Sequence, residues 1–300
     1  MLKQFTGLEK TYKLLLSDNL TWCFKATDSI TPWLDNLAEI MQLVEDNEKT
    51  FDRSLLFLAL KQDNYLPDLD SSCNWKNYKQ GAAYRIWSHD EHHEDFIELN
   101  LDYVNHEEIK FINMSSSLKT LFRYYVDNNG VGPIHAALAE FNRKGILIAA
   151  QGGTGKSTCS KRFPSHWNSL SDDMSLIVKT RENNYRGHPM PTWSDHLCGF
   201  KQSKFNSSYS VPLNAIFFLE QSDIDEVIPL NPIIGAQKIF ESSKQVWGAY
   251  LGKIPKDEER KMIQNIFNHS FDLAKKTPCY ILKATLHGEF WKEIEKVICA

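Results

Sequence analysis

Residues 145–158 read Gly145-Ile-Leu-Ile-Ala-Ala-Gln-Gly-Gly-Thr-Gly-Lys-Ser-Thr158. The apolar run 145–150 is typical of a buried strand, and we expect a helix from about Lys156 to Arg162. A glycine-rich loop between a strand and a helix turns its backbone N–H groups toward one point and so cradles phosphate groups. Lys156 is expected to reach the β- and γ-phosphates, and the Ser157 hydroxyl to ligate Mg²⁺. The stretch therefore predicts a site for the phosphates of a nucleotide, with ATP and Mg²⁺ as the expected ligands.

The loop departs from the full phosphate-loop pattern at one position, because Ala150 stands where the first glycine is expected. A loop of this kind also occurs without catalysis, in proteins that only bind a nucleotide. The residues that we expect to contact the nucleotide are Gln151, Gly152, Gly153, Thr154, Gly155, Lys156, Ser157 and Thr158.

Composition limits the class of protein. The chain has 300 residues, 42% of them hydrophobic, and a net charge of −4, which favours folded domains and does not suggest a general nucleic-acid-binding surface. Its six cysteines include no Cys-x-x-Cys pair, so a zinc ribbon is not expected and free thiols in a reducing cytosol are the simplest account. We see no signal peptide and no apolar stretch long enough to span a bilayer. These features predict a cytoplasmic protein without a membrane partner.

The predicted fold class is α/β, with an α+β module over residues 1–115 and a nucleotide-binding domain over residues 116–300. In the first part we expect a helix over 32–44 and strands over 55–60, 83–87 and 96–101. His89, His92 and His93 lie between the last two strands. We interpret them as part of a solvated turn, because no second cluster of ligands accompanies them.

The second part alternates predicted strands and helices. The expected strands cover 134–141, 145–150, 211–219 and 279–284, the first two joined through residues 142–145. The expected helices cover 115–125, 156–162, 233–250, 257–275 and 290–298.

Two further features are candidates for the site. Asp172 and Asp173 are adjacent in a predicted strand-to-turn context, where both can reach one phosphate and metal site. One would hold Mg²⁺ and the other would accept a proton from an attacking hydroxyl, although an Asp-Asp turn is a common structural feature. His135 precedes Lys156 on a strand expected beside the loop, where it would assist proton transfer or simply fill a structural role.

The segment Tyr185–His196 contains glycine and prolines, which predict a shaped loop. Arg186, His188 and Trp193 are its candidates for substrate contact, with Arg186 as a phosphate partner. The alternative, that Trp193 covers the core and Arg186 lies in solvent, is equally compatible with the sequence. Lys201 and Lys204 are interpreted as ordinary surface charges.

The order of His135, a hairpin, the loop 150–158 and Asp172-Asp173 resembles the HPr kinase/phosphorylase group, whose nucleotide-binding core is shared with ATP-dependent phosphoenolpyruvate carboxykinases. More narrowly, Gly130–Leu138 and His188–Ser194 resemble HPr-kinase-related proteins of peptide-modification cassettes of the SynChlorMet type. The broader resemblance implies that Lys156 and Ser157 contact phosphate and Mg²⁺. It also implies that one of Asp172 and Asp173 is the catalytic base and the other a metal partner, and that His135 belongs to the site. The sequence does not decide between the two aspartates; both are catalytic candidates, and Asp173 joins Ser157 as a candidate metal ligand.

The resulting expectation is a P-loop kinase that transfers the γ-phosphoryl group of ATP to a serine or threonine hydroxyl of a peptide or small protein. The alternative is a nucleotide-controlled peptide-binding module with little or no phosphoryl transfer. Carboxykinase activity is a weaker third option, since no oxaloacetate-binding set is evident. The sequence is compatible with a homo-oligomer and does not decide the oligomeric state, the acceptor or the nucleotide preference.

Overall fold

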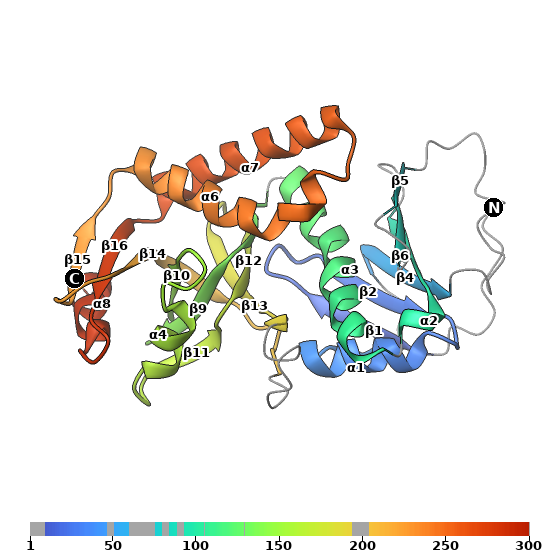
Figure 1. Cartoon of the computed structure of the whole chain (residues 1–300), viewed down its shortest axis with the longest axis horizontal. Coiled ribbons are helices and arrows are strands. Elements are labelled where there is room, and N and C mark those ends of the chain that lie inside the picture. Colours follow the sequence, from blue (N-terminus) through green and yellow to red (C-terminus); the bar gives the residue numbers. More distant parts are fainter. Residues whose placement is uncertain are drawn as a thin grey trace. The chain divides into compact units, whose positions relative to one another are not determined.

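The computed structural model of the chain describes residues 10–46, 51–59, 76–79, 84–88, 93–104, 106–128, 130–193 and 204–299. The chain divides into two compact units, residues 1–121 with 193–208 and residues 122–192 with 209–300. Each unit combines a mixed sheet with helices, so the predicted α/β class is confirmed (Figure 1). The predicted division of labour, with acceptor binding in the first part and nucleotide binding in the second, stays a prediction.

The first unit is built on a sheet with the strand order β3-β1-β2-β4-β7-β6-β5. Its strands are β1 (Thr11–Leu15), β2 (Thr21–Ala26), β3 (Val44–Glu45), β4 (Arg53–Ala59), β5 (Lys76–Lys79), β6 (Tyr84–Ser88) and β7 (Glu94–Leu99). Its helices are α1 (Thr31–Met41) and α2 (Leu101–Val104), and α3 (Glu107–Asp127) crosses into the second unit. β4 lies between two parallel neighbours, β2 and β7, which is why its residues 54–59 are all buried.

The second unit contains a sheet with the order β11-β9-β10-β14-β13-β12-β8, extended by β16 and β15 beyond β14. Its strands are β8 (Gly132–Ile134), β9 (Ala136–Phe141), β10 (Lys144–Ala149), β11 (Asn168–Ser171), β12 (Met174–Lys179), β13 (Tyr185–Met190), β14 (Val211–Gln221), β15 (Glu226–Pro229) and β16 (Cys279–Ala284). Its helices are α4 (Lys156–Arg162), α6 (Pro232–Leu251), α7 (Lys256–Lys276) and α8 (Phe290–Cys299). β10, β14 and β16 run parallel to one another.

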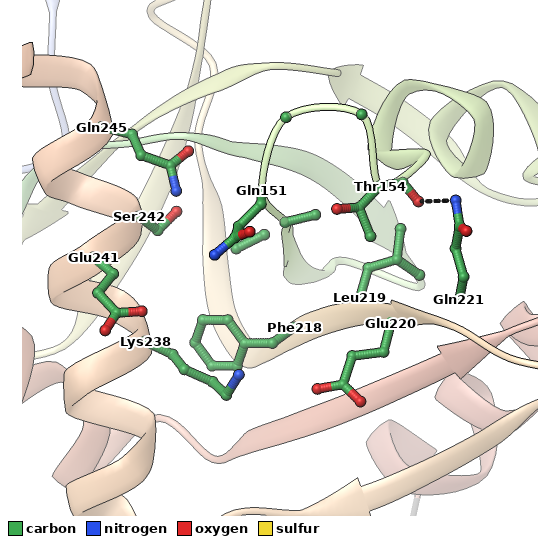
Figure 2. Close-up of a pocket in the computed structure, with 14 residues that line it drawn as sticks. Gln151, Thr154, Phe218, Leu219, Glu220, Gln221, Lys238, Glu241, Ser242 and Gln245 are labelled. Carbon is green, nitrogen blue, oxygen red and sulfur yellow. Dashed lines mark hydrogen bonds between the residues drawn. The ribbon is translucent and has the colours of Figure 1, made fainter.

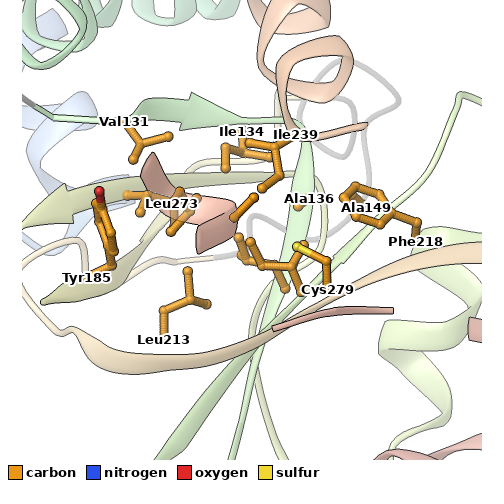
Figure 3. Close-up of a cluster of buried hydrophobic side chains, with 14 of the residues drawn as sticks. Val131, Ile134, Ala136, Ala149, Tyr185, Leu213, Phe218, Ile239, Leu273 and Cys279 are labelled. Carbon is orange, nitrogen blue, oxygen red and sulfur yellow. The ribbon is translucent and has the colours of Figure 1, made fainter. Parts of the chain in front are cut away.

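Both faces of this sheet are covered by helices, and this explains the unbroken apolar run in β10. Leu147 and Ala149 pack in a cluster with residues of α6 and α7, part of which Figure 3 shows. Ile146 and Ile148 point to the opposite face and pack with residues of α4 and α8. A strand that is buried on both sides carries apolar residues at every position, so the glycine-rich loop 150–155 begins from the interior of the unit.

The β9–β10 hairpin confirms the predicted connection through residues 142–145. Asn142 and Arg143 form its two-residue turn with φ values of 50° and 63°, as a primed hairpin turn requires. The predicted helix over 32–44 ends earlier, at Met41, because Gln42 adopts a left-handed φ of 50° that stops it. The helix predicted over 115–125 is longer, since α3 covers 107–127.

Two predictions about the site region are wrong in detail. The single strand expected over 134–141 is broken at His135, which separates β8 from β9. The loop expected from Tyr185 begins instead with a strand, β13, that pairs along its whole length with β12. β14 pairs with β13 at Arg186 and Gly187, so Pro189 lies beyond that pairing, where its missing N–H costs no bond with β14.

Candidate functional site

The glycine-rich loop 150–155 connects the end of β10 at Ala149 to the start of α4 at Lys156, as the sequence predicted for a strand that runs into a helix. Gly153 and Gly155 have φ values of 82° and 101°, in the left-handed region that favours glycine. The Gln221 amide, at the end of β14, donates to the carbonyl of Thr154 at 3.2 Å (Figure 2). The loop is therefore held from the neighbouring strand while Gln151, Gly152 and Gly153 stay exposed.

Lys156 is buried, with 6% of its surface exposed, and its ammonium donates to Asp173 Oδ1 at 2.6 Å. A buried cation requires a partner of opposite charge, and Asp173 supplies it from the turn between β11 and β12. The structure thus brings together two residues that the sequence placed in one site.

His135 joins the same carboxylate. Its Nε2 lies 2.8 Å from Asp173 Oδ1, and its Nδ1 lies 2.5 Å from Gln245 Oε1 on α6. The backbone of His135 is held too: its N–H donates to the Ser242 carbonyl at 3.3 Å, and its own carbonyl accepts the Ser242 hydroxyl at 2.9 Å. These bonds to α6 replace strand pairing at His135, which explains the break between β8 and β9 and fixes the imidazole toward Asp173.

Electrostatics keep Asp173 ionised. Burial alone would raise the pKa of its carboxyl group, but the hydrogen bond from His135 and the charge and hydrogen bond of Lys156 together outweigh burial. The net result is a pKa far below the ordinary value of 3.8. At neutral pH the cluster of Lys156, Asp173 and His135 therefore contains a carboxylate that is bound to at least one cation.

The two adjacent aspartates have different partners. Asp173 faces Lys156 and His135, whereas Asp172 Oδ1 accepts the Thr192 hydroxyl. These adjacent residues at a turn thus point in separate directions. Among the described residues, Asp173 is the aspartate of the pair that contacts Lys156, and Asp172 does not. Which aspartate acts as base and which as metal partner stays a prediction.

The candidates from the segment 185–196 have other surroundings than the Asp173 cluster in their own units. Arg186 donates to the hydroxyl and the carbonyl of Ser210 at 2.8 and 2.6 Å, and His188 is completely buried in β13. Trp193 belongs to the first unit, where it is 8% exposed and its ring lies 6.4 Å from that of Phe111. Lys204 pairs with Glu39 at 2.7 Å on the surface, and Lys201 lies outside the described residues, as do His89 and His92. These contacts do not join the three residues to the Lys156–Asp173–His135 cluster, and a role in substrate binding stays a prediction.

A cavity of about 570 Å³ lies against the outer side of the loop (Figure 2). Its wall opposite the loop is a polar stripe on α6 formed by Lys238, Glu241, Ser242 and Gln245. Sequence reasoning missed these four residues, although their spacing places them on one face of a helix and so gives a signal in the sequence. Gln245 also contacts His135, so this one side chain links the cavity wall to the Asp173 cluster.

No described part of the chain groups three or more His, Cys, Asp or Glu side chains as a metal site would. Among the described helices, none combines the length and the apolar character that crossing a bilayer requires.

Comparison with known families bears on the narrower resemblance and supports its cassette-protein part alone, not the relation to HPr kinases. The model of the family described as SynChlorMet cassette protein ScmC matches residues 98–299, more than half of the chain. The match contains the loop, both aspartates, His135 and Gln245. Curated proteins give no match.

Proposed function

The chain belongs to the SynChlorMet cassette protein ScmC family, and we propose that it is an ATP-dependent kinase with an HPr-kinase-like site. Its reaction is the transfer of the γ-phosphoryl group to a serine or threonine hydroxyl of a peptide or small protein. The observation that carries this proposal is the convergence of Lys156 and His135 on one oxygen of Asp173, directly behind a glycine-rich phosphate loop.

The proposed transfer uses each member of the cluster. We assign the base to Asp173, and not a role as metal ligand alone, because its contacts with Lys156 and His135 place it next to the loop. The acceptor oxygen attacks the γ-phosphorus, its proton passes to Asp173, and the bond between the γ-phosphorus and the bridging oxygen breaks, so that ADP leaves with the electron pair. Lys156 stabilises the charge on the transferred group. His135, held by Gln245, keeps the carboxylate of Asp173 in place.

The ion pair between Lys156 and Asp173 gives nucleotide binding a chemical consequence. Phosphate oxygens compete with Asp173 for the Lys156 ammonium, because the loop directs both to the same lysine. Loss of a cationic partner raises the pKa of a carboxyl group, and this makes the carboxylate a better base. We therefore infer that ATP binding converts Asp173 from a structural partner of Lys156 into a proton acceptor.

The residues present fit Mg²⁺ when the phosphates are counted among its ligands. Ser157 offers a hydroxyl at the start of α4, and the aspartates offer carboxylate oxygens, which are the donors that Mg²⁺ prefers. These groups are too few for a site made of protein alone, as is usual where Mg²⁺ arrives with a nucleotide. Bound there, the ion would neutralise part of the phosphate charge.

The direct test is transfer of label from [γ-³²P]ATP to serine- and threonine-containing peptides, with phosphosites located by mass spectrometry. The cassette description directs the first choice of peptides to those encoded near the gene, followed by an arrayed library. We expect Asp173→Asn to lower the transfer rate about 100-fold or more, the typical effect of removing a general base, and Asp172→Asn to lower it less. Asp28→Asn, an exposed change in the first unit, is the matched control.

The alternative function, a nucleotide-controlled peptide-binding module, leads to a different prediction. It predicts ATP binding that depends on Lys156 and changes peptide affinity, with no labelled peptide for the wild type or any variant. That combination would overturn the kinase proposal and keep the nucleotide site.

A further inference from the structure

A second cavity, of about 730 Å³, lies on the other side of the phosphate loop. It is lined by Gly153 to Gly155, by Thr158, Cys159 and Arg162 of α4, by the end of β14 with the two residues that follow it, and by Ala284–His287, which begin at the last residue of β16. We infer that this cavity binds the nucleoside of the nucleotide, its base and ribose, an inference that rests on the proposed function.

The two cavities meet at the loop, since Gly153, Thr154, Leu219 and Gln221 line both. Only the smaller cavity is lined by Gln245, which leads through His135 to Asp173, so the reacting end of a bound nucleotide belongs on that side. In ATP the base and ribose form one end of an extended molecule, and the γ-phosphate forms the other end. With the terminal phosphate at Lys156, the nucleoside extends past the loop into the larger cavity.

The chemistry of the lining suits a nucleoside. Leu219, Ala284 and Leu286 supply apolar surface for the faces of a planar base, while Ser222, Asp223 and Thr285 supply hydrogen-bonding groups for its edge and for ribose hydroxyls. Small-molecule sites in proteins combine the same two features in cavities of about 300–1,000 Å³.

Hydrogen bonds fix the turn after β16, which forms the cavity wall away from the loop, and they leave one leucine exposed. Arg162, at the end of α4, donates to the carbonyls of Thr285 and Gly288, and the Thr285 N–H donates to Asp225 at 2.6 Å. The segment is closed by a bond of 2.7 Å from the Gly288 N–H to the Thr285 hydroxyl. Leu286 projects from this braced turn with 67% of its surface exposed. An apolar side chain fixed at the rim of a cavity gains from a ligand that covers it.

The test compares ATP with inorganic tripolyphosphate, which has the phosphates and lacks the nucleoside. Affinities are measured by calorimetry with Mg²⁺ for the full chain and for Leu286→Ser. The matched control is Ile233→Ser, which removes an isoleucine that is 73% exposed and lines neither cavity. We expect wild-type protein to bind ATP at least tenfold more tightly than tripolyphosphate. Leu286→Ser should weaken ATP binding about three- to tenfold and leave tripolyphosphate binding unchanged, and Ile233→Ser should change neither.

A second readout uses fluorescence. Leu286→Trp places an indole at the rim, where we expect its emission to change on addition of ATP and not of tripolyphosphate. Equal affinities for the two ligands, both lost in Lys156→Met, would overturn this inference and leave the phosphate site of the proposed function intact. Equal weakening of both ligands by Leu286→Ser would also overturn it. Failure of wild-type protein to bind either ligand would overturn the proposed function, and the nucleoside site with it.

Discussion

At the scale of single residues, the low pKa of Asp173 depends on Lys156. We expect Lys156→Met to raise this pKa toward the ordinary value of 3.8, because the cation is lost while burial still favours the neutral acid. The hydrogen bond from His135 remains and continues to lower the pKa. Titration of the ¹³C-labelled carboxyl group by NMR measures the shift directly. Lys144→Met, which removes an ammonium bound to the carbonyl of Ile298, is the control and should leave Asp173 unchanged. An unchanged Asp173 titration in Lys156→Met would contradict the assigned cause.

The same pair predicts how stability depends on pH. Because folding lowers the pKa of Asp173, its ionisation stabilises the folded chain fully at pH values above 3.8, and the contribution is lost as the pH falls through the lowered folded value. The difference in unfolding free energy between wild type and Lys156→Met should therefore be constant near neutral pH and shrink in acid. Urea denaturation at a series of pH values measures it, and a difference that grows in acid would contradict this account.

Gln245 is a residue that the sequence prediction missed and that the structure places against His135. Its amide offers both an acceptor and a donor to Nδ1 of His135, so Gln245→Leu should loosen the imidazole while Gln245→Glu keeps an acceptor. We expect Gln245→Leu to lower kcat for transfer about tenfold, roughly 1.4 kcal/mol, with KM for ATP unchanged, and Gln245→Glu to retain more activity. Gln264→Leu, an exposed change on α7, is the matched control. A Gln245→Leu enzyme with normal kcat would show that Gln245 has no positioning role.

The sequence predicted Lys156, Asp173 and His135 as neighbours because a phosphate loop and the resemblance define where such residues belong. Gln245 could not be added in this way, because it lies 110 residues from His135 and contacts it through the packing of α6 against β8. Arg186 and His188 illustrate what residue type alone leaves open. Their residue types suit a phosphate site, but the register of β13 places one against Ser210 and the other in the interior.

At the scale of elements, the phosphate loop depends on backbone conformation. Gly153 and Gly155 have positive φ, whereas Gly152 does not, and a Cβ added at any of the three meets no atom within 4 Å. A methyl group would therefore meet no steric clash at any of the three positions, and the three differ only in their backbone φ. We expect Gly155→Ala to cost about 1–2 kcal/mol in unfolding free energy or to distort the loop and weaken tripolyphosphate binding. Gly152→Ala should be close to neutral in both urea denaturation and calorimetry, and equal effects of the two changes would contradict this view.

The periodicity of apolar residues was sufficient to predict the bounds of those elements whose own sequence determines where they begin and end. The strand predicted over 279–284 has the same bounds as β16, and α4 agrees with its predicted range. Local pattern failed where tertiary contacts decide. Ser242 interrupts a predicted strand at His135, and pairing with β12 turns a segment with glycine and proline into β13.

At the scale of the whole molecule, the site is assembled from segments that are distant in sequence. The loop follows β10, Asp173 follows β11, and Gln245 and Ser242 come from α6, all within the second unit. Helical or strand periodicity describes one element at a time and contains no information about which elements become neighbours. The order β11-β9-β10-β14 and the placement of α6 over β8 therefore had to come from the structure.

The division into two units predicts where ATP should stabilise the chain. A ligand that binds only the folded state raises the unfolding free energy by about 2.7 kcal/mol at a ligand concentration of 100 Kd. Compact units with separate cores can differ in local stability, so this gain is expected in the unit that binds the ligand. Hydrogen–deuterium exchange with and without MgATP should therefore show increased protection in peptides covering β10, β14 and α6. Peptides covering β2, β4 and β7 of the first unit should change little. The Lys156→Met variant should lose the effect. Equal protection of both units would mean that they unfold as one body, and protection confined to the first unit would contradict the placement of the nucleotide site in the second.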